Sequence, residues 1–168
     1  MPLNIIFMGT PEFAVPILKS LNDSEHNLLC VYTQPPKKKA RGQKVLSSPI
    51  YQLAEKLKIS VRCPVNLNKD EEYDYIKKIN PNVVIVVAYG QIIPKKILDL
   101  SETIFLNIHA SILPKWRGAA PIQRSIMNLD NETGISIMRI VSKLDSGPVM
   151  MNSKISISKE INYDELSK

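Results

Sequence analysis

The sequence contains little cysteine: among its 168 residues only Cys30 and Cys63 are present. There is no CxxC pair, and no cysteine lies in a cluster with histidine. A disulfide framework and a cysteine–histidine metal site are therefore not expected. We expect two reduced, partly buried thiols, as in a cytoplasmic protein, and no metal ion.

Long apolar runs are also missing. No stretch approaches the roughly 20 apolar residues that a transmembrane helix needs. The opening residues, MPLNIIFMG, lack the basic start and long apolar core of a signal peptide. With 44% apolar and 23% charged residues, the composition is ordinary for a soluble globular protein with one real core. We expect a cytoplasmic location and no membrane partner.

Acidic residues are absent from segment 37–44, KKKARGQK, which carries most of the net charge of +6. The basic excess is therefore a local feature of the chain. The segment lies within residues 34–49, the only long irregular connection that we expect, and connections of this length are usually functional or mobile.

Six apolar runs predict β-strands. The run at 82–88, NVVIVVA, is rich in β-branched residues, and from Val83 on it is apolar on both faces. Such runs are typical of a parallel sheet covered on both faces. The others lie at residues 3–9, 28–33, 103–109, 134–141 and 149–157.

Helical patterns alternate with these runs. Ser48 and Pro49 are suited to the cap and first position of a helix at 49–57. Segment 69–79 has acids early and lysines late, as the helix dipole favours. A helix beginning near residues 10–12 should be kinked or delayed by Pro16, and a helix-like run follows Gly118. This alternation predicts an α/β fold with a mainly parallel sheet.

Glycine is scarce at the first strand-to-helix turn, GTPEF at residues 9–13. The dinucleotide-binding fingerprint needs three glycines at fixed spacing, and this turn has one. Glu12 would also repel a phosphate there. A dinucleotide or P-loop site is therefore not expected.

The strand at 103–109 ends in Asn107 and His109. Residues i and i+2 point to the same side of a strand, and ligands of parallel α/β sheets bind at the carboxyl ends of the strands. A single histidine is more often structural, but an amide and an imidazole together at this place are candidate site residues.

Two segments carry a resemblance to a known family: NIHASILPKWRGAAPIQ at 107–123 and KLDSGP at 143–148. They resemble the folate-dependent formyltransferases, in which Asn-x-His precedes a Ser-Leu-Leu-Pro-like segment and an Asp precedes Gly-Pro. Ile112 replaces the usual leucine. The resemblance runs from Ile5 to the last residue and implies a three-layer α/β/α, Rossmann-like fold.

Four further segments look like the branch of the family that acts on methionyl initiator tRNA. They are MGTPEFAVPIL, TQPPKKKARGQK, VVAYGQIIP and RGAAPIQRSI. The resemblance implies transfer of a formyl group from 10-formyltetrahydrofolate, as co-substrate, to the α-amino group of the methionine. Asn107 would donate to the oxyanion, His109 would be a second donor or general acid, and Asp145 would hold His109 and relay a proton through water.

The resemblance also implies two binding surfaces. Taken alone, residues 89–93 are typical of an ordinary strand-to-helix loop. By resemblance, segments 89–93 and 111–114 would surround the folate, with Tyr89, Gly90, Gln91, Ile92, Ile93, Ser111, Ile112, Leu113 and Pro114. Phe13, otherwise a core residue, would touch the methionine, and Arg117, otherwise a surface anchor, would contact the acceptor end.

The basic segment has three interpretations. It is a solvated surface loop, a nuclear localisation signal, or a contact to the phosphates of the tRNA acceptor stem. The third interpretation gives a substrate-binding role to Lys37, Lys38, Lys39, Arg41 and Lys44.

Members of the family continue with a further helix and strand, a linker and a C-terminal barrel-like domain that helps to hold tRNA. We therefore expect residues 1–168 to be the N-terminal catalytic domain, incomplete at its C-terminal end, of a protein that is monomeric when full-length. Two alternatives stay open: an enzyme that formylates an amino sugar nucleotide or another small amine, or hydrolyses the formyl group to formate, and a non-catalytic folate- or RNA-binding fragment.

Overall fold

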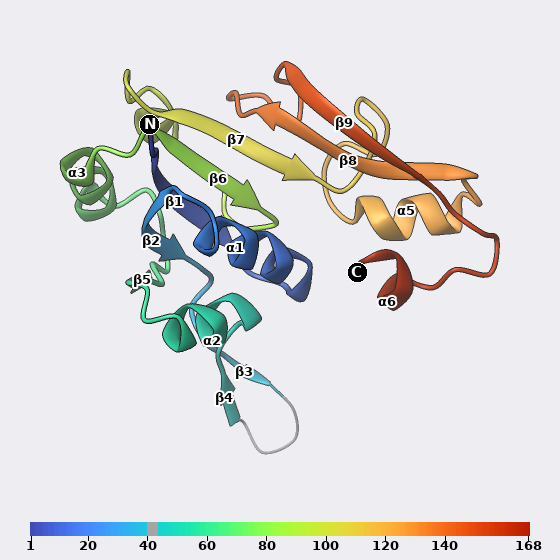
Figure 1. Cartoon of the computed structure of the whole chain (residues 1–168), viewed down its shortest axis with the longest axis horizontal. Helices are drawn as coiled ribbons and strands as arrows, with labels where there is room; N and C mark the ends of the chain where they lie inside the picture. Colours follow the sequence, from blue (N-terminus) through green and yellow to red (C-terminus); the bar gives the residue numbers. More distant parts are fainter. Residues whose placement is uncertain (40–43) are drawn as a thin grey trace. The chain divides into compact units, whose positions relative to one another are not determined.

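The computed structural model describes residues 1–39 and 44–168 (Figure 1). The chain divides into two compact units, an N-terminal unit, Met1–Phe105, and a C-terminal unit, Leu106–Lys168, which are described separately below. The predicted α/β fold is confirmed: seven strands form a mostly parallel sheet, in the order β5-β2-β1-β6-β7-β8-β9. These strands are β1 (Asn4–Gly9), β2 (Asn27–Tyr32), β5 (Val61–Arg62), β6 (Val83–Val87), β7 (Ile104–His109), β8 (Glu132–Arg139) and β9 (Val149–Ser156).

The N-terminal unit is built around β1, which pairs in parallel with β2 on one side and β6 on the other. Four consecutive residues of β1, Ile5 to Met8, are buried. Because successive side chains point to opposite faces of a strand, both faces of the sheet are covered here. The predicted three-layer α/β/α arrangement follows from this double burial.

The helices of the N-terminal unit begin largely where the sequence predicts. Pro16 lies in the first turn of α1, and a short 3-10 helix, η1, precedes it, so the predicted delay is confirmed. The side chain of Ser48 accepts a hydrogen bond of 3.0 Å from the backbone N–H of Tyr51 and caps α2. The helical elements of this unit are η1 (Glu12–Ala14), α1 (Val15–Asn22), α2 (Pro49–Lys56), α3 (Asp70–Ile79) and α4 (Lys95–Leu98).

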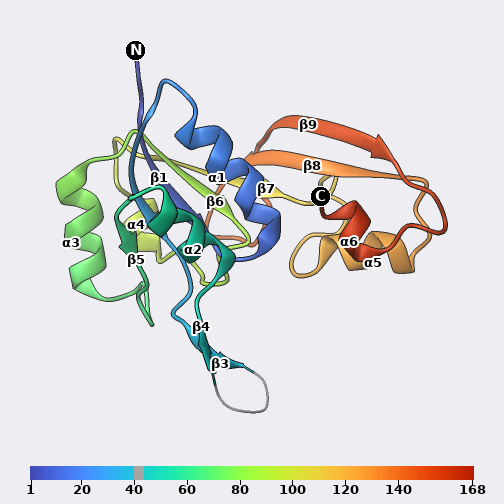
Figure 2. The same cartoon turned by 60° about the horizontal axis from the view of Figure 1, so that its bottom comes forward.

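The prediction of an irregular connection at 34–49 is wrong in part. Lys37–Lys39 forms strand β3 and Lys44–Leu46 forms strand β4, and the two pair antiparallel. The hairpin projects beyond α2 in both views (Figures 1 and 2). Strands of three residues rich in lysine show no alternation of apolar and polar positions, so the pattern on which strand prediction depends is absent.

A buried carboxylate joins α3 to the sheet edge in the N-terminal unit. Glu72 is 5% exposed, and its carboxylate accepts hydrogen bonds from Tyr32 Oη (2.9 Å) and from Arg62 Nε and Nη2 (2.9 Å each). The Arg62 guanidinium also stacks on the Tyr75 ring, 4.1 Å from its centroid. Burial would raise the pKa of Glu72, but the hydrogen bonds from Arg62 and Tyr32 outweigh it and hold the pKa below its usual value.

Glu72→Gln should lower the free energy of unfolding at neutral pH by about 3 kcal/mol, because it removes the buried charge partner of the Arg62 guanidinium and leaves only the exposed Glu71, at 3.0 Å. A lowered folded-state pKa stabilises the fold above the unfolded-state pKa of about 4.3, and this contribution is lost as the pH falls through the folded-state value. The difference between variant and wild type, measured by urea unfolding, should therefore shrink below about pH 4. A difference that persists unchanged in acid would contradict the assigned ionic role. Glu132→Gln, at an exposed pair with Lys154, is the control and should change little.

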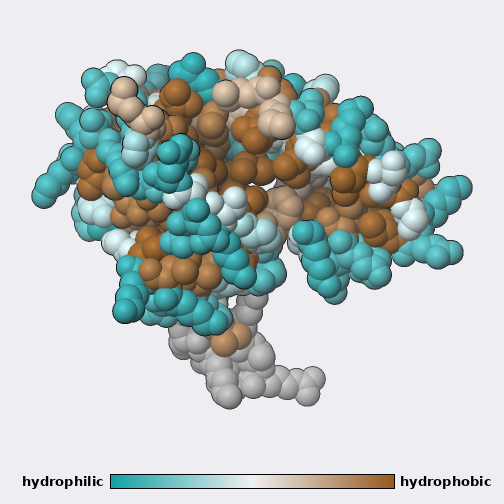
Figure 3. Space-filling model, in the orientation of Figure 1, coloured by the Kyte–Doolittle hydropathy of each residue, from teal (hydrophilic) through white to brown (hydrophobic). Residues whose placement is uncertain are grey.

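The C-terminal unit combines the greater part of β7 with β8 and β9, paired antiparallel. Two helices, α5 (Pro121–Met127) and α6 (Tyr163–Leu166), lie side by side in both cartoon views (Figures 1 and 2). Asn162 and Glu165 form a capping box at the start of α6. The residues of β9 are exposed, including Met150 and Met151, and Figure 3 shows apolar side chains at the molecular surface among hydrophilic ones.

Within residues 1–39 and 44–168, no helix is long and apolar enough to cross a membrane. In the same part of the chain, the histidine, cysteine and acidic side chains form no group of three or more that could hold a metal ion.

Candidate active site

Strand β7 delivers Asn107 and His109 to one face of the sheet. Antiparallel pairing places Asn107 opposite Met138 and His109 opposite Ser136 of β8. Asn107 is half-buried, and His109 is 7% exposed. The i, i+2 spacing read from the sequence therefore places both side chains on the same side of the strand, as predicted.

The turn after β8 positions Asp145. The backbone N–H of Arg139 donates to the Pro148 carbonyl at 2.9 Å. A Cβ atom at Gly147 would lie only 1.9 Å from the Arg139 carbonyl oxygen, so this close approach requires glycine. Asp145 itself has φ 42°, in the left-handed region that aspartate tolerates better than most residues. The turn thus bends sharply and returns Asp145 toward β7.

The carboxylate of Asp145 lies between the two side chains of β7. Asn107 Nδ2 donates to Asp145 Oδ1 at 3.4 Å, and His109 Nδ1 lies 3.8 Å from Asp145 Oδ2. The backbone N–H of Gly118 donates to Oδ2 at 2.8 Å. An amide donor, an imidazole and a carboxylate are thus assembled in one place, a set suited to stabilising an oxyanion and moving a proton.

The segment after β7 is held by a residue that sequence reasoning missed. Ser136 is fully buried, and its hydroxyl donates to the Ser111 carbonyl at 2.7 Å and accepts from the Leu113 N–H at 3.0 Å. Two backbone groups of the predicted folate segment are therefore occupied within the protein. Leu113 is buried, Ile112 half-buried and Pro114 exposed.

In the N-terminal unit, the loop after β6 is tied to the carboxyl ends of β1 and β2. The Tyr89 carbonyl accepts hydrogen bonds from Thr10 Oγ1 (2.8 Å) and Gln34 Nε2 (3.2 Å). Gly90 has φ +88°, and a Cβ atom there would meet the Gln34 side chain at 3.4 Å. The Tyr89 ring is buried, and its hydroxyl has no hydrogen-bond partner among the described residues.

The side chain of Gln91 holds a neighbouring backbone segment. Its Oε1 accepts from the Leu67 N–H at 2.9 Å, and its Nε2 donates to the Pro64 carbonyl at 2.8 Å. Both polar groups of the Gln91 amide are therefore hydrogen-bonded within the chain. Beyond it, Ile92 is 88% exposed and Ile93 is buried, so the loop presents Ile92 and its backbone to solvent.

Gln91→Ala should release the segment around Leu67. The Leu67 N–H and the Pro64 carbonyl lose their partner, which costs about 1–2 kcal/mol at a partly buried place. Hydrogen exchange of the Leu67 amide should accelerate with it. Gln52→Ala is the matched control, because that amide makes one exposed bond of 3.2 Å to Ser47. Unchanged protection of Leu67 in the Gln91 variant would show that the clamp does not hold the segment.

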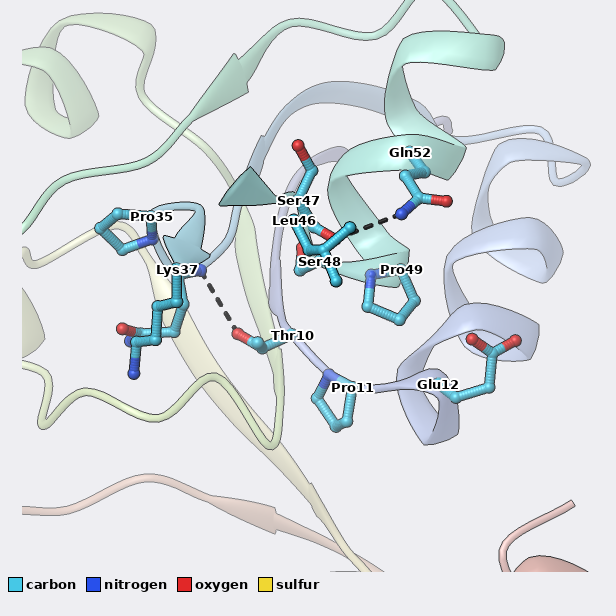
Figure 4. A pocket seen from close by; sticks show the side chains of 11 residues that line it. Thr10, Pro11, Glu12, Pro35, Lys37, Leu46, Ser47, Ser48, Pro49 and Gln52 are labelled. Carbon is cyan, nitrogen blue, oxygen red and sulfur yellow. Dashed lines mark hydrogen bonds between the residues drawn. The ribbon is translucent and has the colours of Figure 1, made fainter. Parts of the chain in front are cut away.

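A pocket of about 570 Å³ lies at the carboxyl ends of β1 and β2 and at the start of α2 (Figure 4). Three of its lining residues, Pro11, Pro35 and Pro49, come from three separate segments of the chain (Figure 4). Of the predicted substrate-binding residues, Lys37 lines it. The remaining lining residues are Thr10, Glu12, Gln34, Leu46, Ser47, Ser48 and Gln52.

The other predicted tRNA-binding residues are distributed over the chain. Phe13 is half-buried in η1, and Arg117 is exposed in the loop before α5. The backbones of Lys38, Lys39 and Lys44 belong to the hairpin β3–β4, whereas Arg41 lies outside the described residues.

Four residues that organise these places gave no signal in the sequence. Thr10 and Gln34 donate to a loop carbonyl, Ser136 occupies an ordinary strand position, and Asp130 lies in the segment NLDNETG, for which the sequence predicts no role. Thr10, Gln34 and Ser136 act through partners more than twenty residues away, and two of the four donors to Asp130 come from another loop. No periodicity predicts such contacts.

The fold is a mostly parallel α/β sheet with an amide, an imidazole and a carboxylate at the end of one strand. A model of the formyl transferase family matches residues 3–168, and the chain belongs to that family.

Among its relatives, methionyl-tRNA formyltransferase from Pelagibacter ubique is 58% identical over 168 residues, which is 99% of this chain and 54% of the relative. The enzyme of the same name from Methylobacterium nodulans is 46% identical over 166 residues, again 99% of this chain and 54% of the relative. The chain thus spans about half the length of the curated relatives that it matches.

Solved structures share the fold. Phosphoribosylglycinamide formyltransferase from Anaplasma phagocytophilum superimposes with a TM-score of 0.78 at 18% identity, covering 99% of this chain and 78% of the other. A formyltetrahydrofolate deformylase from Pseudomonas syringae gives a TM-score of 0.76 at 17% identity, covering 99% and 55%.

Proposed function

We propose that the chain is the formyl-transferring domain of an enzyme that formylates the α-amino group of methionyl initiator tRNA from 10-formyltetrahydrofolate. The observation that carries the proposal is the cluster of Asn107, His109 and Asp145, joined at 3.4 and 3.8 Å. The identity of 58% with a methionyl-tRNA formyltransferase supports the choice of acceptor. The cytoplasm, where translation begins, is the corresponding location, and no metal ion is needed.

The reaction exchanges one C–N bond for another. The co-substrate supplies the formyl carbon and a nitrogen leaving group; the amine attacks that carbon, and the bond to the leaving nitrogen breaks. A proton leaves the attacking amine, and one must reach the departing nitrogen. The residues must therefore stabilise an oxyanion and transfer a proton.

The donor set fits these needs. Asn107 Nδ2 has two hydrogens, and one bond of 3.4 Å to Asp145 leaves the other for an oxyanion. His109 provides an ionisable group beside it. Asp145 accepts from Gly118 and faces His109 Nδ1, so it can stabilise a proton on that nitrogen and pass a proton onward through water.

We infer that the loop 89–93, in the N-terminal unit, and segment 111–114, in the C-terminal unit, contribute groups that bind the folate. Their backbones are fixed by Thr10 and Gln34 in one case and by Ser136 in the other, which favours binding without a large loss of conformational entropy. Because the Gln91 side-chain amide is already hydrogen-bonded to the Pro64 carbonyl and the Leu67 N–H, we assign it the role of shaping the loop.

Asn107→Ala, His109→Ala and Asp145→Ala should each reduce the rate of formyl transfer by about 10²–10³-fold, because each removes a contact made in the transition state. Folate affinity should fall much less. The measurement is single-turnover formylation of methionyl-tRNA, on the chain and on the chain joined to the remaining half of the Pelagibacter ubique relative.

Lys154→Ala, at an exposed ion pair with Glu132, is the control and should retain wild-type turnover. Near-normal turnover in His109→Ala would refute the role given to the imidazole. Formylation of a small amine in place of tRNA would instead favour the small-substrate alternative, and binding without turnover in the joined protein would favour the non-catalytic one.

Replacing the five basic residues of segment 37–44 with glutamine should weaken tRNA binding and flatten its salt dependence. These residues are Lys37, Lys38, Lys39, Arg41 and Lys44. Each lost phosphate contact should reduce the slope of log affinity against log salt by roughly 0.7–0.9. Arg41→Ala alone should weaken binding more than any single lysine variant, because a guanidinium binds phosphate in a fixed two-pronged geometry. A salt titration of tRNA binding measures both effects.

The control for this titration removes the same charge from five exposed lysines elsewhere in the chain: Lys19, Lys56, Lys58, Lys78 and Lys159. Folate affinity should not change in either protein. Equal slopes for the wild type and the segment variant would mean that residues 37–44 form a solvated surface segment.

A further inference from the structure

Besides Asp145, the C-terminal unit contains another carboxylate with a buried side chain, Asp130, which no part of the proposed reaction uses. Its side chain is 5% exposed and accepts four hydrogen bonds. The donors are Lys115 Nζ (2.7 Å), Trp116 Nε1 (2.7 Å), Ser125 Oγ (2.9 Å) and Asn128 Nδ2 (2.7 Å). Burial would raise the pKa of Asp130, but these hydrogen bonds outweigh it and hold the pKa well below its usual range. Asp130 is therefore a permanently charged acceptor at neutral pH.

Two of the four donors come from the loop between β7 and α5. The backbone of that loop is unusual: Trp116 has φ 57°, Gly118 has φ 84° and Ala120 has φ 58°. A left-handed conformation costs roughly 1–2 kcal/mol for a residue with a side chain. The hydrogen bonds of Lys115 and Trp116 to Asp130 offset this cost and hold residues 115–118 in place.

The same loop contacts both ionisable members of the candidate active site. The Trp116 carbonyl lies 2.9 Å from His109 Nε2, and the Gly118 N–H donates to Asp145 Oδ2 at 2.8 Å. Ser111 Oγ also donates to the Lys115 carbonyl at 2.6 Å. A displacement of residues 115–118 would thus disturb His109 and Asp145 together.

The contact to His109 determines which ring nitrogen carries the proton. A carbonyl oxygen accepts and cannot donate, so His109 Nε2 must be the donor. A neutral imidazole has only one N–H, so the lone pair is on Nδ1. This nitrogen faces the Asp145 carboxylate at 3.8 Å, so a proton taken up on Nδ1 during the reaction is stabilised by that carboxylate.

We propose that Asp130 is a positioning residue: through Trp116 and the backbone of residues 115–118 it keeps the proton of neutral His109 on Nε2 and directs Nδ1 toward Asp145. The proposal rests on the role given to His109 in the proposed function. Ring orientation by a hydrogen bond to the other nitrogen is a general device for setting a histidine tautomer.

The chain offers a direct test, because it contains only two histidines, His26 and His109. Nitrogen-15 NMR of the imidazole rings, at a pH where both are neutral, reports the tautomer of each, and His26→Gln assigns the signals. In the wild type His109 should show a protonated Nε2, with slow hydrogen exchange, and an unprotonated Nδ1. In Asp130→Asn the Nε2–H should exchange at least tenfold faster, and a population with Nδ1–H should appear.

Trp116→Phe removes the indole donor and keeps an aromatic ring, so it should change the His109 spectrum in the same direction. It decides the question if Asp130→Asn does not fold. Glu72→Gln is the matched control: it also weakens a buried, multiply bonded carboxylate, but in the N-terminal unit, and should leave the His109 spectrum unchanged. An unaltered spectrum in the folded Asp130 or Trp116 variant would overturn the proposal, as would an equal change in Glu72→Gln.

Turnover provides a second measurement, on the chain joined to the remaining half of the Pelagibacter ubique relative. Asp130→Asn should lower kcat by about 10- to 100-fold, as loss of a supporting contact does at other sites, with little change in the folate KM. A wild type that shows the Nε2–H tautomer but transfers no formyl group would refute the proposed function and leave the positioning role standing. A folded Asp130→Asn with unchanged kcat would overturn the positioning role.

Discussion

The antiparallel pairing of β7 with β8 is the constraint on which the candidate active site depends. It places Ser136 opposite His109, and the Ser136 hydroxyl then fixes the backbone after β7. It also sets where β8 ends, and therefore where the turn that carries Asp145 returns. Because a shift of one residue would turn each side chain to the other face, this register decides whether an amide, an imidazole and a carboxylate meet at all.

In the N-terminal unit the loops at the strand ends are ordered differently, because its strands are parallel and buried on both faces. The core there fixes the strands but leaves the loops at their carboxyl ends to be ordered by other means. Amide and hydroxyl side chains serve this purpose: Thr10 and Gln34 bind the Tyr89 carbonyl, and Gln91 binds Pro64 and Leu67. Side-chain bonds to the backbone allow loops to be rigid without regular structure, as a binding surface requires.

Much of this organisation can be predicted from the sequence, because it follows from local patterns. The buried strands are apolar runs, Ser48-Pro49 marks the start of α2, and Asn107 and His109 share a face by spacing alone. The hairpin β3–β4 escaped prediction because its strands are three residues long and mostly lysine. Ser136 escaped because its partners are set by tertiary structure, and Asp130 because two of its four donors, Lys115 and Trp116, lie in another loop. Gln91 was assigned to the folate site by resemblance, which stays a prediction, and its contacts with Pro64 and Leu67 span more than twenty residues.

Two aspartates of the C-terminal unit show how surroundings distinguish an anchoring carboxylate, Asp130, from the carboxylate that we propose takes part in the reaction, Asp145. A carboxylate has about four lone-pair sites, and Asp130 fills them with hydrogen bonds from Lys115, Trp116, Ser125 and Asn128. Among the described residues, Asp145 accepts one short bond from Gly118 and one longer bond from Asn107. A saturated carboxylate has no capacity to bind water or to accept a proton without losing a bond, whereas Asp145 keeps that capacity. Residues 115–118 contact both carboxylates, Asp130 through Lys115 and Trp116 and Asp145 through Gly118. In the positioning role proposed above, the saturated hydrogen bonding of Asp130 therefore supports the place of Asp145.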